Sequence, residues 1–230
     1  LVGSEMCIRD SLGPCLVHDR HRCVRTHRGE WCRQSMLLGV CSGAQVPTSG
    51  HVLIDGVELT ARPSRREALR RIAFMPQSAS APGNLSVLET VTYLTWMRGA
   101  PWSRARQQAR QALALVDLEK MSDTRCKALS GGMQRRVWLA QALASEADVL
   151  LLDEPSTGLD PRQRQLMLTA LHRAAETGAT IVLSSHVLED VADLADHLVV
   201  LTHGTVAFDA AMPESLDSTW FLDVTDGVRP

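Results

Sequence analysis

Short, largely apolar segments alternate with helical patterns in the second half of this chain. The segments are 149–152, 180–183 and 198–201, and helical spacing fills residues 161–176 and 187–195 between them. Apolar runs of this length are typical of strands buried on both faces, and connections through helices make neighbouring strands parallel. We therefore expect an α/β fold whose mostly parallel sheet is covered by helices on both faces.

The preceding hundred residues predict two smaller units. Residues 52–59 form a hairpin pattern around the turn Asp55-Gly56, which indicates a small antiparallel β flap. A short basic helix at 64–71 leads into a strand at 72–75, which Pro76 ends. Helical spacing then follows in three segments, which indicate an inserted helical subdomain at about 84–144. These segments are 86–98, 103–116 and the residues after Gly132.

Composition narrows the function classes. The formal net charge is −2 over 230 residues, which argues against a nucleic-acid partner bound through overall positive charge. The apolar runs are too short to cross a bilayer, and the start of the chain carries no signal-peptide pattern. We expect one large cytoplasmic domain.

The cysteines mark a break in composition. Five of the six fall in the first 41 residues. A disulfide framework is not expected in a cytosolic chain of this size. Cys15, His18, His21 and Cys23 could in principle bind zinc, but their spacing matches no usual zinc pattern, and we assign no metal there.

Polar side chains stand where three of the expected strands end. Asp153 and Glu154 follow the strand at 149–152, Gln77 follows the strand at 72–75, and His186 follows the strand at 180–183. Ligands of such sheets bind at the carboxyl ends of the strands. Two adjacent carboxylates suit phosphoryl transfer, where one holds Mg²⁺ and the other polarises the attacking water. The alternative is an ordinary acidic turn, with Gln77 and His186 as plain loop residues.

A second polar group opens a predicted helix. Ser130, Gly131, Gly132 and Gln134 lie at its start, in the segment Leu129-Ser-Gly-Gly-Met-Gln134. A hydroxyl and unhindered amide N–H groups at the positive end of a helix favour a bound phosphate. The alternative is a serine N-cap followed by flexible glycines.

These two segments together resemble the signature and the nucleotide-site strand of an ATP-binding-cassette (ABC) ATPase, and the match in order and spacing extends over residues 43–209. The resemblance implies a P-loop NTPase-like fold that binds ATP and Mg²⁺. It implies that Asp153 and Gln77 reach the metal, that Glu154 polarises water, and that His186 contacts the γ-phosphate. Asp160, in the segment Ser156-Thr-Gly-Leu-Asp160, resembles the D-loop residue that spans two nucleotide domains.

The resemblance also implies partners. The signature segment of this family faces ATP bound by an opposite subunit, so a second nucleotide-binding subunit is expected, identical or homologous. The compact domain and the segment 184–190 look like bacterial exporter subunits of the drug or ABC-2 type, which work with a membrane-spanning permease at the inner face of the cell membrane. The alternatives are a soluble ABC protein that acts on ribosomes or DNA, and a subunit that does not bind nucleotide.

The phosphate-loop motif that such an ATPase needs is not recognisable in this sequence. The expected window reads Arg28-Gly-Glu-Trp-Cys-Arg-Gln-Ser35, in which Ser35 stands in register for the Mg²⁺-binding hydroxyl while the glycines and the lysine are absent. One reading is a divergent, degenerate ATPase.

The other reading is a change of frame. Residues 30–35 can be encoded as GAA TGG TGC CGG CAA AGC, and a one-base shift gives Asn-Gly-Ala-Gly-Lys. Restoring one A then returns the frame at Ser35, and the upstream codons permit Leu-Thr-Gly-Val. We therefore expect residues 1–34 to be out of frame, with 1–11 foreign, and to replace the first strands and the phosphate loop. The ATPase domain then spans 35–212, and 213–230 is a tail without assigned function.

Overall fold

A computed structural model describes residues 6–10, 13–17, 21–26, 31–78, 82–202 and 205–227, with side chains from residue 34 onward. The elements in chain order are β1 (Met6–Asp10), β2 (Gly13–Val17), β3 (His21–Thr26), α1 (Trp31–Cys41), β4 (His51–Ile54), β5 (Val57–Glu58), α2 (Arg62–Arg71), β6 (Ile72–Met75), α3 (Val87–Met97), α4 (Trp102–Leu115), the 3-10 turns η1 (Glu119–Met121) and η2 (Cys126–Ala128), α5 (Gly131–Ala144), β7 (Val149–Asp153), α6 (Pro161–Glu176), β8 (Thr180–Ser184), α7 (Leu188–Leu194), β9 (His197–Thr202), β10 (Thr205–Ala211) and α8 (Ser218–Thr225).

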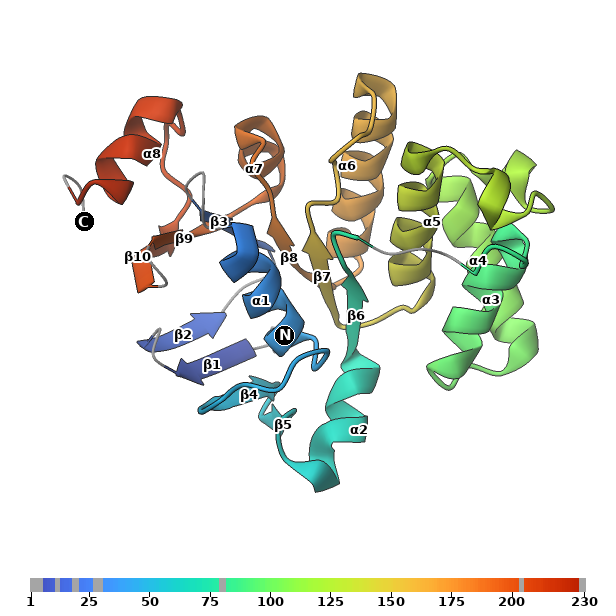
Figure 1. Cartoon of the computed structure of the whole chain (residues 1–230), viewed down its shortest axis with the longest axis horizontal. Helices are drawn as coiled ribbons and strands as arrows, with labels where there is room; N and C mark the ends of the chain where they lie inside the picture. The colour runs from blue at the N-terminus through green and yellow to red at the C-terminus, as the bar shows by residue number, and fades with distance from the viewer. Residues whose placement is uncertain are drawn as a thin grey trace.

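The main sheet is the mostly parallel sheet that the sequence predicts. Its order is β10-β9-β3-β8-β7-β6, and every neighbouring pair is parallel except the edge pair β10 and β9. In Figure 1 the helices lie around this sheet, with α5, α6 and α7 side by side and α1 on the other side. The fold is therefore α/β, as expected.

Alternate residues of the central strands enter two separate cores. Leu150 and Leu152 of β7 pack in the larger core with side chains of α3 to α8, whereas Val149 and Leu151 pack in the smaller core with α1, α2 and β4. All five residues of β7 are buried. A strand that is buried on both faces has a continuous apolar sequence, which explains why β7 could be predicted from the sequence.

The antiparallel flap and the helical subdomain are also present. β4 and β5 form the predicted hairpin, and Asp55 and Gly56 have φ values of 48° and 74°, as a tight two-residue turn requires. Helices α3, α4 and α5 pack against one another at one end of the molecule (Figure 1). Helix α3 starts with the predicted capping box, in which the Ser86 hydroxyl accepts from the Glu89 N–H and the Glu89 carboxylate accepts from the Ser86 N–H. The domain boundaries given above remain predictions.

Several elements were not predicted from the sequence. The chain before residue 43 showed no readable periodicity, but the structure has β1, β2, β3 and α1 there, with β3 between β8 and β9 in the main sheet. α2 begins at Arg62 rather than Ser64 because Pro63 occupies its first turn. β10 and α8 were missed as well.

Helix α8 lies within the tail to which no function was assigned. Its Trp220, Phe221 and Val224 are buried, and the Trp220 ring meets the Phe208 ring of β10 edge-on, with centroids 5.0 Å apart. The tail is thus packed on the core of the described domain through a single apolar face.

We predict that replacing Trp220 destabilises the domain. Trp220→Ala should lower the free energy of unfolding by about 3 kcal/mol, because truncating a buried aromatic leaves a cavity against the sheet. Leu222→Ala on the same helix is the control, since Leu222 is 48% exposed and should cost about 0.5 kcal/mol or less. Urea denaturation followed by circular dichroism measures both. Equal costs for the two variants would show that α8 does not pack as described.

Candidate nucleotide-hydrolysis site

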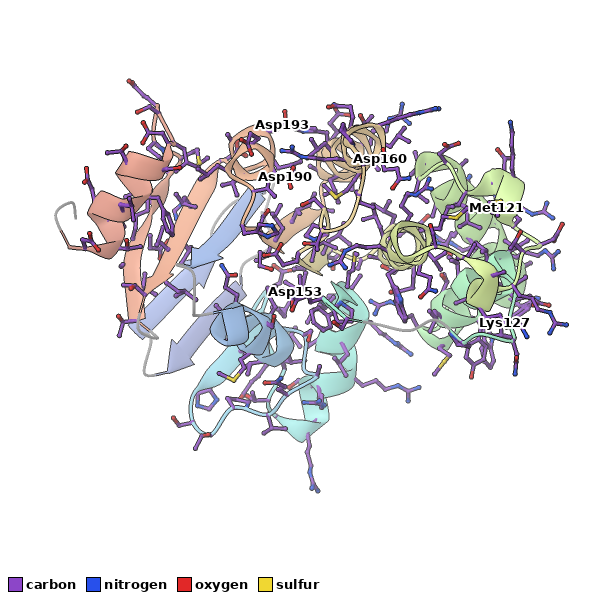
Figure 2. The ribbon with its side chains drawn as sticks, turned by 45° about the horizontal axis from the view of Figure 1, so that its top comes forward. Met121, Lys127, Asp153, Asp160, Asp190 and Asp193 are labelled. Atoms are coloured by element: carbon purple, nitrogen blue, oxygen red, sulfur yellow. The ribbon has the colours of Figure 1, made fainter. Side chains whose placement is uncertain are left out.

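The ends of β7 and β8 place two acidic residues in different environments. The strands pair in parallel with Asp153 opposite Ser184. The Ser184 hydroxyl donates to Asp153 Oδ1 at 2.6 Å and accepts from the Glu154 N–H at 3.0 Å. Asp153, Glu154 and Ser184 are all buried, and none of the three residues is more than 3% exposed. Figure 2 shows Asp153 near the centre of the molecule.

Glu154 turns away from the strand direction and meets the histidine. Its φ is 52°, in the left-handed region that non-glycine residues seldom adopt. Its carboxylate Oε2 lies 2.6 Å from Nδ1 of His186 and accepts from the Thr157 hydroxyl at 3.1 Å. The His186 side chain is 46% exposed, whereas that of Glu154 is 4% exposed. A buried carboxylate thus lies within hydrogen-bond distance of an imidazole that is open to solvent.

Arg135 connects Gln77 to this group, and sequence reasoning missed it. Its Nε donates to the Glu154 carbonyl at 3.0 Å, its Nη2 donates to the same carbonyl, and its Nη1 donates to the Gln77 carbonyl at 3.2 Å. Burial lowers the pKa of the Arg135 guanidinium, while the Glu154 and then the Asp153 carboxylates raise it. Because arginine does not lose its proton in proteins, a fixed positive charge stands beside the two acids. No sequence signal marked this residue.

The signature residues lie at the start of α5. Ser130 is the N-cap and accepts from the Met133 N–H at 3.3 Å, while Gln134 donates to the Leu129 carbonyl at 3.3 Å. Ser130 and Gly131 are exposed. A Cβ on Gly132 would lie 3.2 Å from the carbonyl oxygen of Gly158, a tight contact that would push these two segments slightly apart.

Asp160 has a different place from the other acids. It caps α6 by accepting from the Gln163 N–H at 2.8 Å, and it is exposed. In Figure 2 it lies on α6, well apart from Asp153. The structure therefore brings Asp153, Glu154 and His186 together and links the Gln77 carbonyl to Glu154 through Arg135, and it leaves Ser130, Gly131 and Asp160 exposed.

Ser35 is not at the start of a helix, where a phosphate loop would hold it. α1 begins at Trp31, so Ser35 is the fifth residue of the helix and is half-buried.

The zinc alternative at Cys15, His18, His21 and Cys23 lies outside the side chains that the structure describes. Among the described side chains, no group of three His, Cys, Asp or Glu residues could hold a metal ion. Mg²⁺ that arrives with a nucleotide needs only one or two carboxylates besides the phosphates and water.

Comparison with known proteins decides the family. The sequence model of the family described as "ABC transporter" matches residues 34–157, just over half of the chain. The chain belongs to this family. Two solved ABC structures share the fold. A dimeric bacterial ABC transporter cassette has a TM-score of 0.80 at 20% identity, over 91% of this chain and 100% of that one. An ATP-binding subunit of an ABC transporter has 0.82 at 19%, over 96% and 99%.

Curated ABC proteins named for export, for drug resistance and for import are similar to the chain. A Nod factor export ATP-binding protein I of Burkholderia orbicola is 32% identical over 88% of the chain and 64% of the relative. The daunorubicin/doxorubicin resistance ATP-binding protein DrrA of Streptomyces peucetius is 32% identical over 73% and 50%. A spermidine/putrescine import ATP-binding protein PotA of Legionella pneumophila is 33% identical over 76% and 48%. The chain thus spans about half to two thirds of the length of these relatives. Within the described residues, no helix is long and apolar enough to cross a membrane.

We predict that the Ser184 hydroxyl is needed to hold the strand end of this ABC domain. Ser184→Ala leaves the buried Asp153 carboxylate and the Glu154 N–H each without one partner, and it should lower the free energy of unfolding by about 1–3 kcal/mol. Thr169→Ala is the control, because the exposed Thr169 hydroxyl donates only to a carbonyl of its own helix. Chemical denaturation measures the difference. A cost for Ser184→Ala no larger than that for Thr169→Ala would contradict the described network.

Proposed function

We propose that the chain is the ATP-binding and ATP-hydrolysing subunit of an ABC exporter. One observation carries this proposal: the buried Glu154 carboxylate, at the end of a central parallel strand, lies 2.6 Å from His186 and directly follows a second buried acid, Asp153. Glu154 is the residue to polarise the attacking water, and His186 is the residue to receive or return a proton at Nδ1. Asp153 and Gln77 are the residues to hold Mg²⁺, which would neutralise charge on the phosphates when bound.

The residues fit ATP at one side of the site only. The acids at the end of β7 suit a metal and a water, and Asp153 already has its orientation fixed by Ser184. The window before Ser35 supplies neither the glycines nor the lysine that hold phosphates. This mismatch favours a second candidate, a subunit of the same family that does not bind nucleotide.

Support for transport outward comes from the Nod factor export relative, which aligns with 88% of the chain. The import relative aligns with 76% and the drug-resistance relative with 73%. An exporter subunit would act in the cytoplasm at the inner face of the cell membrane.

Two surfaces suit the two expected partners. Ser130, Gly131 and Asp160 are exposed, as required if they contact ATP or residues of a second nucleotide-binding subunit. On α3 and α4, Trp96, Met97 and Trp102 are each more than two fifths exposed. Met97 also lines a groove of about 420 Å³ together with Arg66 and Arg70. This apolar and basic surface suits a cytoplasmic segment of a permease with apolar and acidic side chains.

The absence of a phosphate loop fits the proposed frame change. The family match begins at residue 34, one residue before the position at which the restored frame would resume. Restoring one base would give the phosphate loop directly before Ser35. The proposal is therefore that an active ABC subunit has lost its phosphate loop in residues 1–34, rather than that the family here has diverged.

We predict that the chain as printed binds ATP weakly and that the frame-restored chain binds it at least about 100-fold more tightly, because the phosphate-binding amides and the lysine return. Isothermal titration with ATP and Mg²⁺ compares the two. Resequencing the genomic DNA is the independent check. An unbroken frame with only three A bases at the codons for Gln34 and Ser35, or tight binding by the printed chain, would contradict the frame proposal.

We predict that Glu154→Gln in the frame-restored chain abolishes ATP turnover and leaves ATP binding intact. The amide keeps the size of the side chain but cannot accept a proton from water, and a loss of about 100-fold or more in kcat is expected for a lost general base. Glu146→Gln is the matched control, since Glu146 pairs with Arg104 on the surface. Phosphate release and nucleotide titration measure the two quantities. Hydrolysis that persists in Glu154→Gln would remove Glu154 from this role.

A further inference from the structure

The guanidinium of Arg135, on α5, bonds to the backbone of the segment that follows β6 and of the segment that follows β7. Three of its N–H groups point at two backbone carbonyls, those of Glu154 and Gln77. The two carbonyls follow different strands, β7 and β6, and the arginine comes from the helical subdomain. A single planar group therefore joins three segments that are far apart in sequence.

The contact acts on the residue whose backbone is strained. Glu154 has φ 52°, a conformation that costs a non-glycine residue on the order of 1 kcal/mol and persists only when its surroundings fix it. Ser184 fixes the amide side of Glu154, because the Ser184 carbonyl and hydroxyl both accept from the Glu154 N–H. Arg135 fixes the carbonyl side. The direction of the Glu154 carboxylate toward His186 follows from this backbone conformation.

We propose that Arg135 is a positioning residue: it holds the Glu154 peptide in its left-handed conformation from the helical subdomain, and it thereby sets the contact between Glu154 and His186. Any shift of α5 relative to β7 moves the carboxylate that the proposed function makes the catalytic base. The proposal rests on that function only where it calls Glu154 the catalytic base, since the contacts of Arg135 exist without nucleotide.

The neighbouring arginine provides a matched control. Arg136 is also on α5, is buried, and donates to two carbonyls, those of Val116 at 2.9 Å and Asp117 at 3.2 Å. These carbonyls belong to the helical subdomain and lie on no strand end. A merely structural role for Arg135 predicts that losing either arginine has the same kind of effect.

The test uses the full printed chain without nucleotide, isotopically labelled for NMR, with Arg135→Gln and Arg136→Gln. Two signals report on the strand end. One is amide exchange at Glu154 and Thr157, whose N–H groups bond to Ser184 and to the Glu154 carbonyl. The other is the pair of ring-nitrogen shifts of His186, which show how the Nδ1 proton is shared with Glu154. Neither signal depends on ATP binding, so a failure of the proposed function leaves this test intact.

Arg135→Gln should raise exchange at Glu154 and Thr157 about tenfold or more and shift the His186 ring nitrogens, because charge-assisted hydrogen bonds to the Glu154 carbonyl are lost. Arg136→Gln should leave both signals at their original values and raise exchange near residues 116–118. If Arg135→Gln does not fold, Arg135→Lys, which keeps the charge without the planar fork, is judged by the same signals. Unchanged signals at Glu154, Thr157 and His186, or an equal response to both arginine variants, would overturn the proposal.

Discussion

The hydroxyl of Ser184 determines how two adjacent acids can have two roles. Consecutive strand residues point to opposite faces of a sheet, so Asp153 and Glu154 could not both face one site from a regular strand. Ser184 donates to the first acid and accepts from the amide of the second, at the last paired position of β7 and β8. The chain leaves the strand at this point, and Glu154 takes its left-handed turn. The contacts of Glu154 with His186, Thr157 and Arg135 all depend on that turn.

The elements whose bounds were predicted correctly are those that begin or end at a proline or a glycine. β6 runs from Ile72 to Met75, as predicted, because Pro76 cannot continue the ladder, and α6 runs from Pro161 to Glu176, between a first-turn proline and Gly178. The missed elements lack such signals. α8 has one apolar face only two turns long in a polar tail, and it is helical because the surface of β9 and β10 gives that face something to cover. β10 is an edge strand with a bulge, which weakens its period-two pattern.

The candidate site divides in the same way. The contact among Asp153, Glu154 and His186 agrees with the rule that parallel strands end on one edge, which also predicts Gln77 near them. Arg135, Ser184 and Thr157 were missed because each acts through the backbone or through another side chain, and such contacts leave no spacing pattern. Ser184 had a weak signal, a serine that ends a buried strand next to one that ends in aspartate. Arg135 had none, since it reaches the site only when α5 packs against both loops.

The hydrolytic and the phosphate-binding sides of the site are built from different parts of the chain. The hydrogen bonds on the hydrolytic side join Gln77, Arg135, Glu154, Asp153, Ser184 and His186, all of which follow Ser35 in the chain. Residues 31–34 of the window before Ser35, in contrast, form the first turn of α1 in the structure. A helix start offers a few amide donors and the equivalent of about half a positive charge, which is far short of what the triphosphate of ATP requires without a lysine. The printed chain therefore keeps the residues that would orient water while lacking those that would hold the nucleotide. A change confined to the segment before Ser35 is sufficient to account for that difference.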